Sequence, residues 1–222
     1  MLAVTLLFLV ASVRASVEGE NLRPIIAILT QDYDAKLNET YIAASYVKWV
    51  ESAGGRVVPL HYDASTSEIS AVLSKVNGVL FPGGGASFVK GSKMRSTGEL
   101  IYDFAIRANN AGKTFPLWGT CLGFQFMAVL AADDDNILCS DCFNSEGTPL
   151  PLDFTAAARH SILFRGMSDE LYKDLATQNI TENSHHDGVP PSKFLTNAKL
   201  KAAYQVKRVT ACLAIAFTTK SL

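Results

Sequence analysis

Apolar and polar positions along the chain form blocks that predict strands followed by helices. Short runs of β-branched and other apolar residues, typical of strands buried on both faces of a sheet, recur between residues 24 and 119. Between them, apolar residues are spaced three and four positions apart, as in amphipathic helices. The predicted strands are 24–30, 56–62, 78–82 and 115–119, and the predicted helices are 40–53, 67–76, 98–110 and 122–131.

This order predicts an α/β fold with an open, mostly parallel sheet, right-handed crossovers and helices on both faces. Beyond residue 150 the pattern is less regular. There it predicts a helix over 168–176, a short helix over 190–197 and a strand over 202–206. No repeat, low-complexity tract or long linker divides the 222 residues, which predicts one sizeable domain.

Composition excludes two classes of protein. Apolar residues make up 48% and charged residues 18% of the chain, which is too hydrophobic for a disordered protein. The 20 Lys and Arg residues are balanced by 21 Asp and Glu residues, and no basic run is interleaved with aromatic residues. A nucleic-acid partner is therefore not expected.

The first residues have the pattern of a secretory signal peptide. The apolar run from Leu2 to Val13 is too short to span a bilayer and ends in the small-x-small pattern Val13-Arg14-Ala15. We expect a signal peptide over 1–15 and no membrane segment after its removal; a buried N-terminal strand or helix is the alternative. On a secretory route, Asn38 and Asn179 become predicted glycosylation sites, because each begins an Asn-x-Thr sequon.

Four cysteines occur, and two of them form a CxxC pair. Cys139 and Cys142 have the spacing of a redox pair, half a zinc site or a local disulfide. Because the sequence has no second CxxC or HxxxH, the pattern argues against zinc and leaves a disulfide or two free thiols. No metal and no cofactor are expected.

The strongest chemical signal is the motif Gly119-Thr120-Cys121-Leu122-Gly123, where a predicted strand meets a predicted helix. In a nucleophile elbow the sharp turn strains the backbone of the nucleophile, so its neighbours two residues away must be small. The start of the following helix favours the thiolate of Cys121 over the thiol. The amide of Leu122 points at the same place and is a candidate oxyanion donor.

A second glycine-rich loop, Gly83-Gly84-Gly85, ends the preceding predicted strand at the same edge of the sheet. Gly84 is the candidate for the second oxyanion amide, and the backbone of Gly83 and Gly85 can approach a substrate. The alternative is a buried core cysteine in a glycine-rich turn. The carboxyl end of a central parallel strand is where open α/β sheets place their sites, which favours a catalytic Cys121.

Four segments together resemble the γ-glutamyl hydrolase family of the class I glutamine amidotransferase-like hydrolases. They are FPGG at 81–84, WGTCLGFQ at 118–125, YIAASYVK at 41–48 and ESAG at 51–54, and the likeness extends over about 22–206. The resemblance implies a flavodoxin-like sheet with Cys121 as the nucleophile that forms a thioester. It also implies cleavage of folate or antifolate poly-γ-glutamates in lysosomes or after secretion, with a homodimer as one assembly state.

The resemblance also singles out His185. The family has a functional histidine in a segment similar to residues 183–188, where His185 is the match and His186 its neighbour. The implied role is contact with the substrate rather than that of the base. Two solvated loop histidines are the alternative.

One departure from the family pattern puts activity in doubt. The family carries its catalytic His and Glu in a Trp-His-Pro-Glu-like segment, whereas none of His61, His160, His185 and His186 is followed by Pro-Glu. Residues 207–222 do not resemble the family, which predicts an incomplete set of final strands. The alternatives are a catalytically silent protein that binds γ-glutamyl ligands and an amidotransferase-like hydrolase of different acyl specificity.

Overall fold

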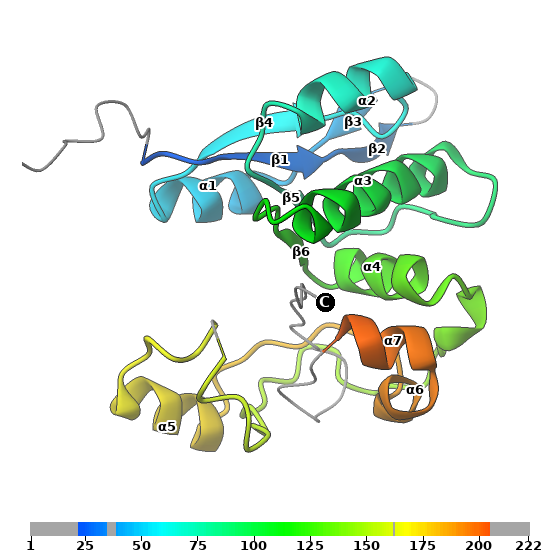
Figure 1. Ribbon diagram of the computed structural model, residues 1–222. Helices are drawn as coiled ribbons and strands as arrows, with labels where there is room; N and C mark the ends of the chain where they lie inside the picture. Colours follow the sequence, from blue (N-terminus) through cyan, green and yellow to red (C-terminus); the bar gives the residue numbers. More distant parts are fainter. Residues whose placement is uncertain (1–21, 35–38, 162, 205–222) are drawn as a thin grey trace, which may run out of the picture.

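The computed structural model describes residues 22–34, 39–161 and 163–204. The predicted signal peptide, Asn38 and the tail over 207–222 lie outside these residues. The main sheet has four parallel strands in the order β4-β1-β5-β6 (Figure 1). The strands are β1 Ile25–Leu29, β4 Arg56–Leu60, β5 Gly78–Phe81 and β6 Leu117–Gly119.

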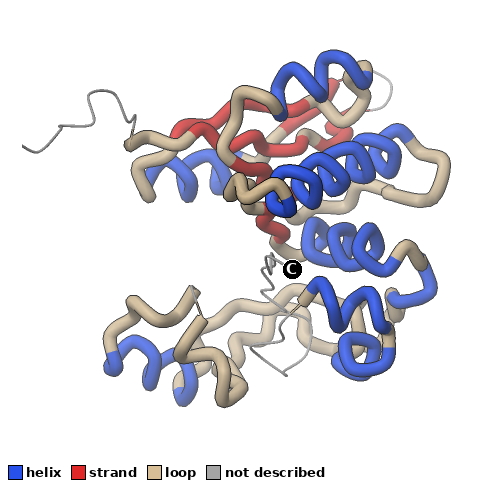
Figure 2. Tube along the Cα trace, viewed as in Figure 1, coloured by secondary structure: helices blue, strands red, loops and turns tan. Residues whose placement is uncertain are grey.

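Helices cover both faces of this sheet, as the alternating pattern predicted (Figure 2). Successive side chains of a strand point to opposite faces. Ala27 and Leu29 pack with α2 Thr66–Leu73, α3 Lys93–Asn110 and α4 Leu122–Ala132 on one face. Ile28 packs with α1 Ala44–Ser52 on the other.

An antiparallel hairpin of β2 Gln31–Asp34 and β3 Glu39–Tyr41 was not predicted. The predicted helix over 40–53 therefore begins later, at Ala44, because Thr40 and Tyr41 pair with β2. In contrast, α3 begins earlier than predicted. Its start is set by Ser92, whose side chain accepts a hydrogen bond from the amide of Arg95 and caps the helix.

The chain after α4 contains little regular structure. It comprises the 3-10 helix η1 Asp135–Ile137, α5 Asp169–Thr177, α6 Pro191–Thr196 and α7 Ala198–Ala203. The predicted strand over 202–206 is wrong at 202 and 203, which end α7, and 205–206 lie outside the described residues. Asn197 favours a helix over a strand here, because its side chain accepts a hydrogen bond from the amide of Leu200 and caps the start of α7.

The sheet with its helices and the chain after residue 134 meet on α4. Ten of the eleven residues of this helix are buried. Phe126, Met127 and Leu130 face the sheet side. Phe124 packs with residues of α6 and α7 in a second core. A helix that is apolar all round is expected where both of its sides are covered. Among the described residues, no helix has the length and apolar character needed to cross a membrane.

Candidate functional site

Cys121 lies at a sharp turn between β6 and α4. Its backbone has φ 55° and ψ −118°, a conformation that L-residues rarely adopt. Its carbonyl accepts hydrogen bonds from the amides of Phe124 and Gln125, which begin the helix. The turn therefore holds the thiol at the helix N-terminus and at the carboxyl edge of the sheet, the arrangement of a nucleophile elbow.

The close approach of α4 to the sheet explains both glycines of the motif. A Cβ on Gly119 would lie 2.8 Å from the carbonyl carbon of Gly123. A Cβ on Gly123 would lie 1.9 Å from the carbonyl oxygen of Phe81 in β5. No larger residue fits either position unless the backbone moves.

The glycine loop after β5 lies directly against Cys121. A Cβ on Gly83 would be 3.0 Å from the Cβ of Cys121. The amide of Gly83 donates to the hydroxyl of Tyr46 at 2.8 Å, so it is already used within the protein. Among the described residues, the amides of Gly84 and Leu122 have no acceptor. The amides of Gly84 and Leu122 therefore stay candidate oxyanion donors, and Gly85 has open space around it.

Gln31, which no sequence motif singled out, holds this loop in place. The side chain is 4% exposed, and its Nε2 donates to the carbonyl oxygens of Pro82 at 3.3 Å and Gly83 at 3.2 Å. A Cβ on Gly84 would lie 2.0 Å from Gln31 Oε1, so Gly84 is required there. The signal in the sequence was a polar residue two positions after a buried strand, at the edge where the site forms.

His185 is brought to the nucleophile from the other part of the chain. Its Nδ1 lies 3.6 Å from the sulfur of Cys121, although 64 residues separate them. The side chain is 6% exposed, and burial lowers the pKa of His185. The neutral imidazole is therefore favoured. With its proton on Nε2, Nδ1 can accept the thiol proton.

The remaining histidines contact other groups. His61 Nδ1 lies 3.0 Å from the hydroxyl of Thr40. His186 pairs with Glu146 at the surface, and His160 is exposed. Of the four histidines, all within the described residues, His185 is the one in contact with Cys121.

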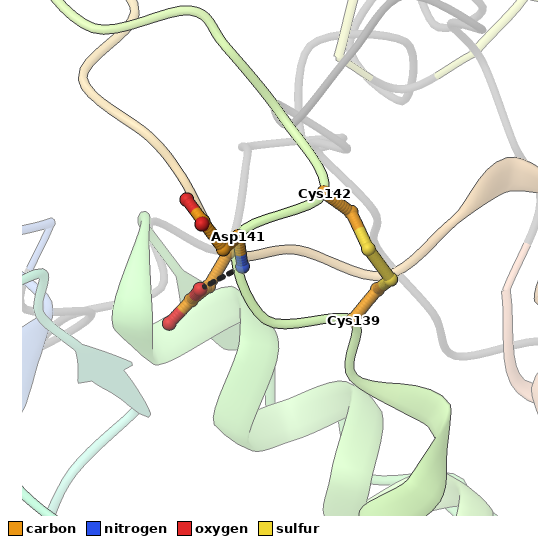
Figure 3. The surroundings of a disulfide bond; sticks show 4 residues. Cys139, Asp141 and Cys142 are labelled. Atoms are coloured by element: carbon orange, nitrogen blue, oxygen red, sulfur yellow. Dashed lines mark hydrogen bonds between the residues drawn. A yellow bond between two sulfur atoms is a disulfide. The ribbon is translucent and has the colours of Figure 1, made fainter.

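The cysteine alternatives are resolved by the structure. Cys139 and Cys142 form a disulfide (Figure 3), and among the described residues Cys121 is a free thiol. Within the described part of the chain, no three His, Cys, Asp or Glu side chains are grouped as metal ligands would be. Asn179, which follows α5, is exposed, as a glycosylation site must be. Its glycosylation stays a prediction.

Known proteins match most of this chain. The peptidase C26 family matches residues 24–134. Gamma-glutamyl hydrolase B of Dictyostelium discoideum is 37% identical over 190 residues, which cover 84% of this chain and 54% of that protein. Gamma-glutamyl hydrolase of Rattus norvegicus is 37% identical over 197 residues, 87% of this chain and 61% of that protein. Gamma-glutamyl hydrolase of Homo sapiens is 35% identical over 188 residues, which cover 83% of this chain and 58% of that protein.

The chain thus spans little more than half the length of these curated relatives. Within that span the similarity extends from the strands of the sheet through the elbow to the segment of His185. Together with the parallel sheet and the free thiol at the elbow, it shows that the chain belongs to the peptidase C26 family, as a member of its γ-glutamyl hydrolase group.

Proposed function

We propose that this protein hydrolyses the γ-glutamyl bonds of folate or antifolate polyglutamates through a thioester on Cys121. The observation that carries the proposal is the contact between the sulfur of Cys121 and Nδ1 of His185, at 3.6 Å, beside two unused backbone amides. The names of the relatives, gamma-glutamyl hydrolases, support the choice of bond.

In the first step, the thiol proton of Cys121 passes to Nδ1 of His185 and the sulfur attacks the γ-carbonyl carbon. The carbonyl oxygen becomes an oxyanion that the amides of Leu122 and Gly84 stabilise. The C–N bond then breaks, and the leaving amine takes the proton from His185. This leaves the γ-glutamyl thioester on Cys121.

In the second step, water attacks the thioester while His185 accepts its proton. The carbon–sulfur bond breaks, and the proton returns to the sulfur. The mechanism thus gives His185 the role of the base, whereas the resemblance implied contact with the substrate rather than that role. Burial supports this role, because a histidine of lowered pKa stays available as a base in mildly acidic solution.

A protein that binds γ-glutamyl ligands without cleaving them is the second candidate. One observation favours it. Among the described residues, no side chain accepts a hydrogen bond from Nε2 of His185, whereas a third group usually orients such a histidine. In this case Cys121 and the glycine loop would form a ligand pocket that lacks an efficient base.

The experiment incubates the purified chain with a folate that carries several γ-linked glutamates and follows the chain length of the substrate by mass spectrometry. The matched variants are Cys121→Ala and His185→Gln. We expect shortening by the wild type, none by Cys121→Ala, and a rate at least about 100-fold lower for His185→Gln, as for the loss of a general base.

Each alternative outcome has a defined meaning. Tight binding of the substrate by a folded wild type without shortening would support the second candidate. Equal shortening by the wild type and Cys121→Ala would show that the reaction does not pass through this thiol.

We also propose that the protein follows the secretory route to the extracellular space or the lysosome. The signal-peptide pattern, the exposed Asn179 and the disulfide support this, because disulfides persist in oxidising compartments. Expression in animal cells should give a product that begins after Ala15 and loses mass on deglycosylation. An intact N-terminus on a cytosolic product would contradict it.

A further inference from the structure

His185 lies on a segment without regular structure, here called the histidine segment, residues 183–188. A second irregular segment, residues 139–145, runs antiparallel beside it and contains the disulfide; it is called the bridged segment. The amide of Ser145 donates to the carbonyl of His185, and the amide of Phe143 donates to the carbonyl of His186 at 2.9 Å. The backbone position of His185 is thus set by the bridged segment.

The contacts continue through the disulfide turn itself. Cys139 and Gly188 exchange two backbone hydrogen bonds, of 2.8 and 3.1 Å. The amide of Asp141 donates to Oδ1 of Asp187 at 2.7 Å (Figure 3). Asp141 has φ 56°, a left-handed conformation that the four-residue disulfide ring holds. The ring restricts the conformations open to this turn and so favours its hydrogen bond to Asp187.

The other side of the histidine segment is tied to the nucleophile helix. Gln125, one turn after Cys121 on α4, is buried, and its Nε2 donates to the carbonyl of Asp187 at 2.9 Å. The histidine segment therefore lies between α4 and the bridged segment. The hydrogen bond of Gln125 thus connects the histidine segment to α4 independently of the bridged segment.

We propose that the Cys139–Cys142 disulfide is a positioning element that holds His185 against Cys121. The inference rests on the Cys121–His185 pair of the proposed function and extends it to the residues that maintain the pair. A misplacement of about 1 Å between reacting groups can cost on the order of 100-fold in rate, so a small movement of the histidine segment matters. A dithiol reduces the disulfide by transferring two electrons and two protons, which leaves two free thiols. This reduction loosens the contact between Cys121 and His185.

The test measures the rate constant for alkylation of Cys121 by iodoacetamide from pH 5 to pH 8, resolved by peptide mass spectrometry. The chains are the wild type, Cys139→Ser/Cys142→Ser, His185→Gln and the triple variant. We expect the Ser/Ser variant and His185→Gln each to lose about tenfold near pH 6.5. The triple variant should lose no more than His185→Gln alone, since the disulfide acts through the histidine.

A matched pair of substitutions checks the route of this effect. Asp187→Asn keeps an oxygen acceptor for the amide of Asp141, whereas Asp187→Ala removes it. We expect Asp187→Asn to retain the alkylation profile better than Asp187→Ala.

The same measurement is made on wild type that has been reduced with a phosphine, after the phosphine is removed. This repeats the Ser/Ser measurement on the natural residues and does not depend on the folding of a variant.

Two outcomes separate the inference from the proposed function. If reduced wild type and the Ser/Ser variant alkylate at the wild-type rate while His185→Gln is slow, the inference is overturned and the Cys121–His185 pair stands. If His185→Gln also alkylates like the wild type, the pair itself has no effect on the thiol, and the proposed mechanism fails with the inference.

Discussion

Residues 22–134 and residues 135–204 contribute to the same site but are built differently. The first region is a parallel sheet with long helices, and its backbone groups pair within regular structure. The second is held by two isolated bridges, a disulfide and short helices. Cys121 belongs to the first region and His185 to the second. The strained nucleophile thus has a rigid support, while its partner depends on a few local contacts.

The two halves of the site should therefore respond differently to substitutions. The elbow is determined by backbone packing of β5, β6 and α4, and its disruption endangers the fold. We expect the histidine segment to shift more readily than the sheet, because it contacts the elbow and α4 through the side chains of His185 and Gln125. Three perturbations test the contrast.

The largest effect is expected in the first region. Gly123→Ala places a Cβ 1.9 Å from the carbonyl oxygen of Phe81, which forces α4 away from the sheet. We expect a loss of about 3 kcal/mol or more in the free energy of unfolding, measured by urea denaturation. Gly85→Ala is the control, because no atom lies within 4 Å of its added Cβ, and it should be nearly neutral. Equal stability of the two variants would contradict the packing argument.

An intermediate effect is expected where the regions are joined by charge. Arg95 of α3 is 3% exposed and pairs with Glu99 and, across the regions, with Asp135. Arg95→Met should lower the free energy of unfolding by about 2 kcal/mol, less than for a fully buried pair because both carboxylates are half-exposed. Lys199→Met breaks the exposed Lys199–Asp133 pair and should cost about 0.5 kcal/mol or less. A larger cost for Lys199→Met would overturn this ranking.

The smallest effect concerns pH and the second region. Burial lowers the pKa of His185, so below about pH 6.5 the unfolded chain binds a proton that the folded chain resists. Wild-type stability should therefore fall as the pH is lowered from 7.5 to 5. His185→Gln should lessen that fall, by a fraction of either loss above. Urea denaturation at pH 7.5 and at pH 5 measures the change in the free energy of unfolding. The same change in the wild type and in His185→Gln would show that burial of His185 does not cause the fall.

Much of the first region could be predicted from local sequence patterns. The four parallel strands follow from short apolar runs, and the helices from their spacing. The hairpin of β2 and β3 could not, because its residues are polar and its pairing depends on tertiary contacts such as that between Gln31 and the loop at Pro82. The error at residues 202–203 has a different cause. A short apolar stretch suits strand or helix equally, and the capping side chain of Asn197 decided between them.

The sequence by itself determined the elbow. A nucleophile between two glycines at a strand–helix junction is recognisable because the steric restrictions act within a few residues. Only the tertiary structure decided that Nδ1 of His185 lies 3.6 Å from the sulfur of Cys121, that Gln31 holds the glycine loop, and that Cys139 bonds to Cys142. The first two contacts join segments that are 64 and 52 residues apart, and such distances are set by packing on α4 and the sheet. No periodicity or spacing along the chain encodes them.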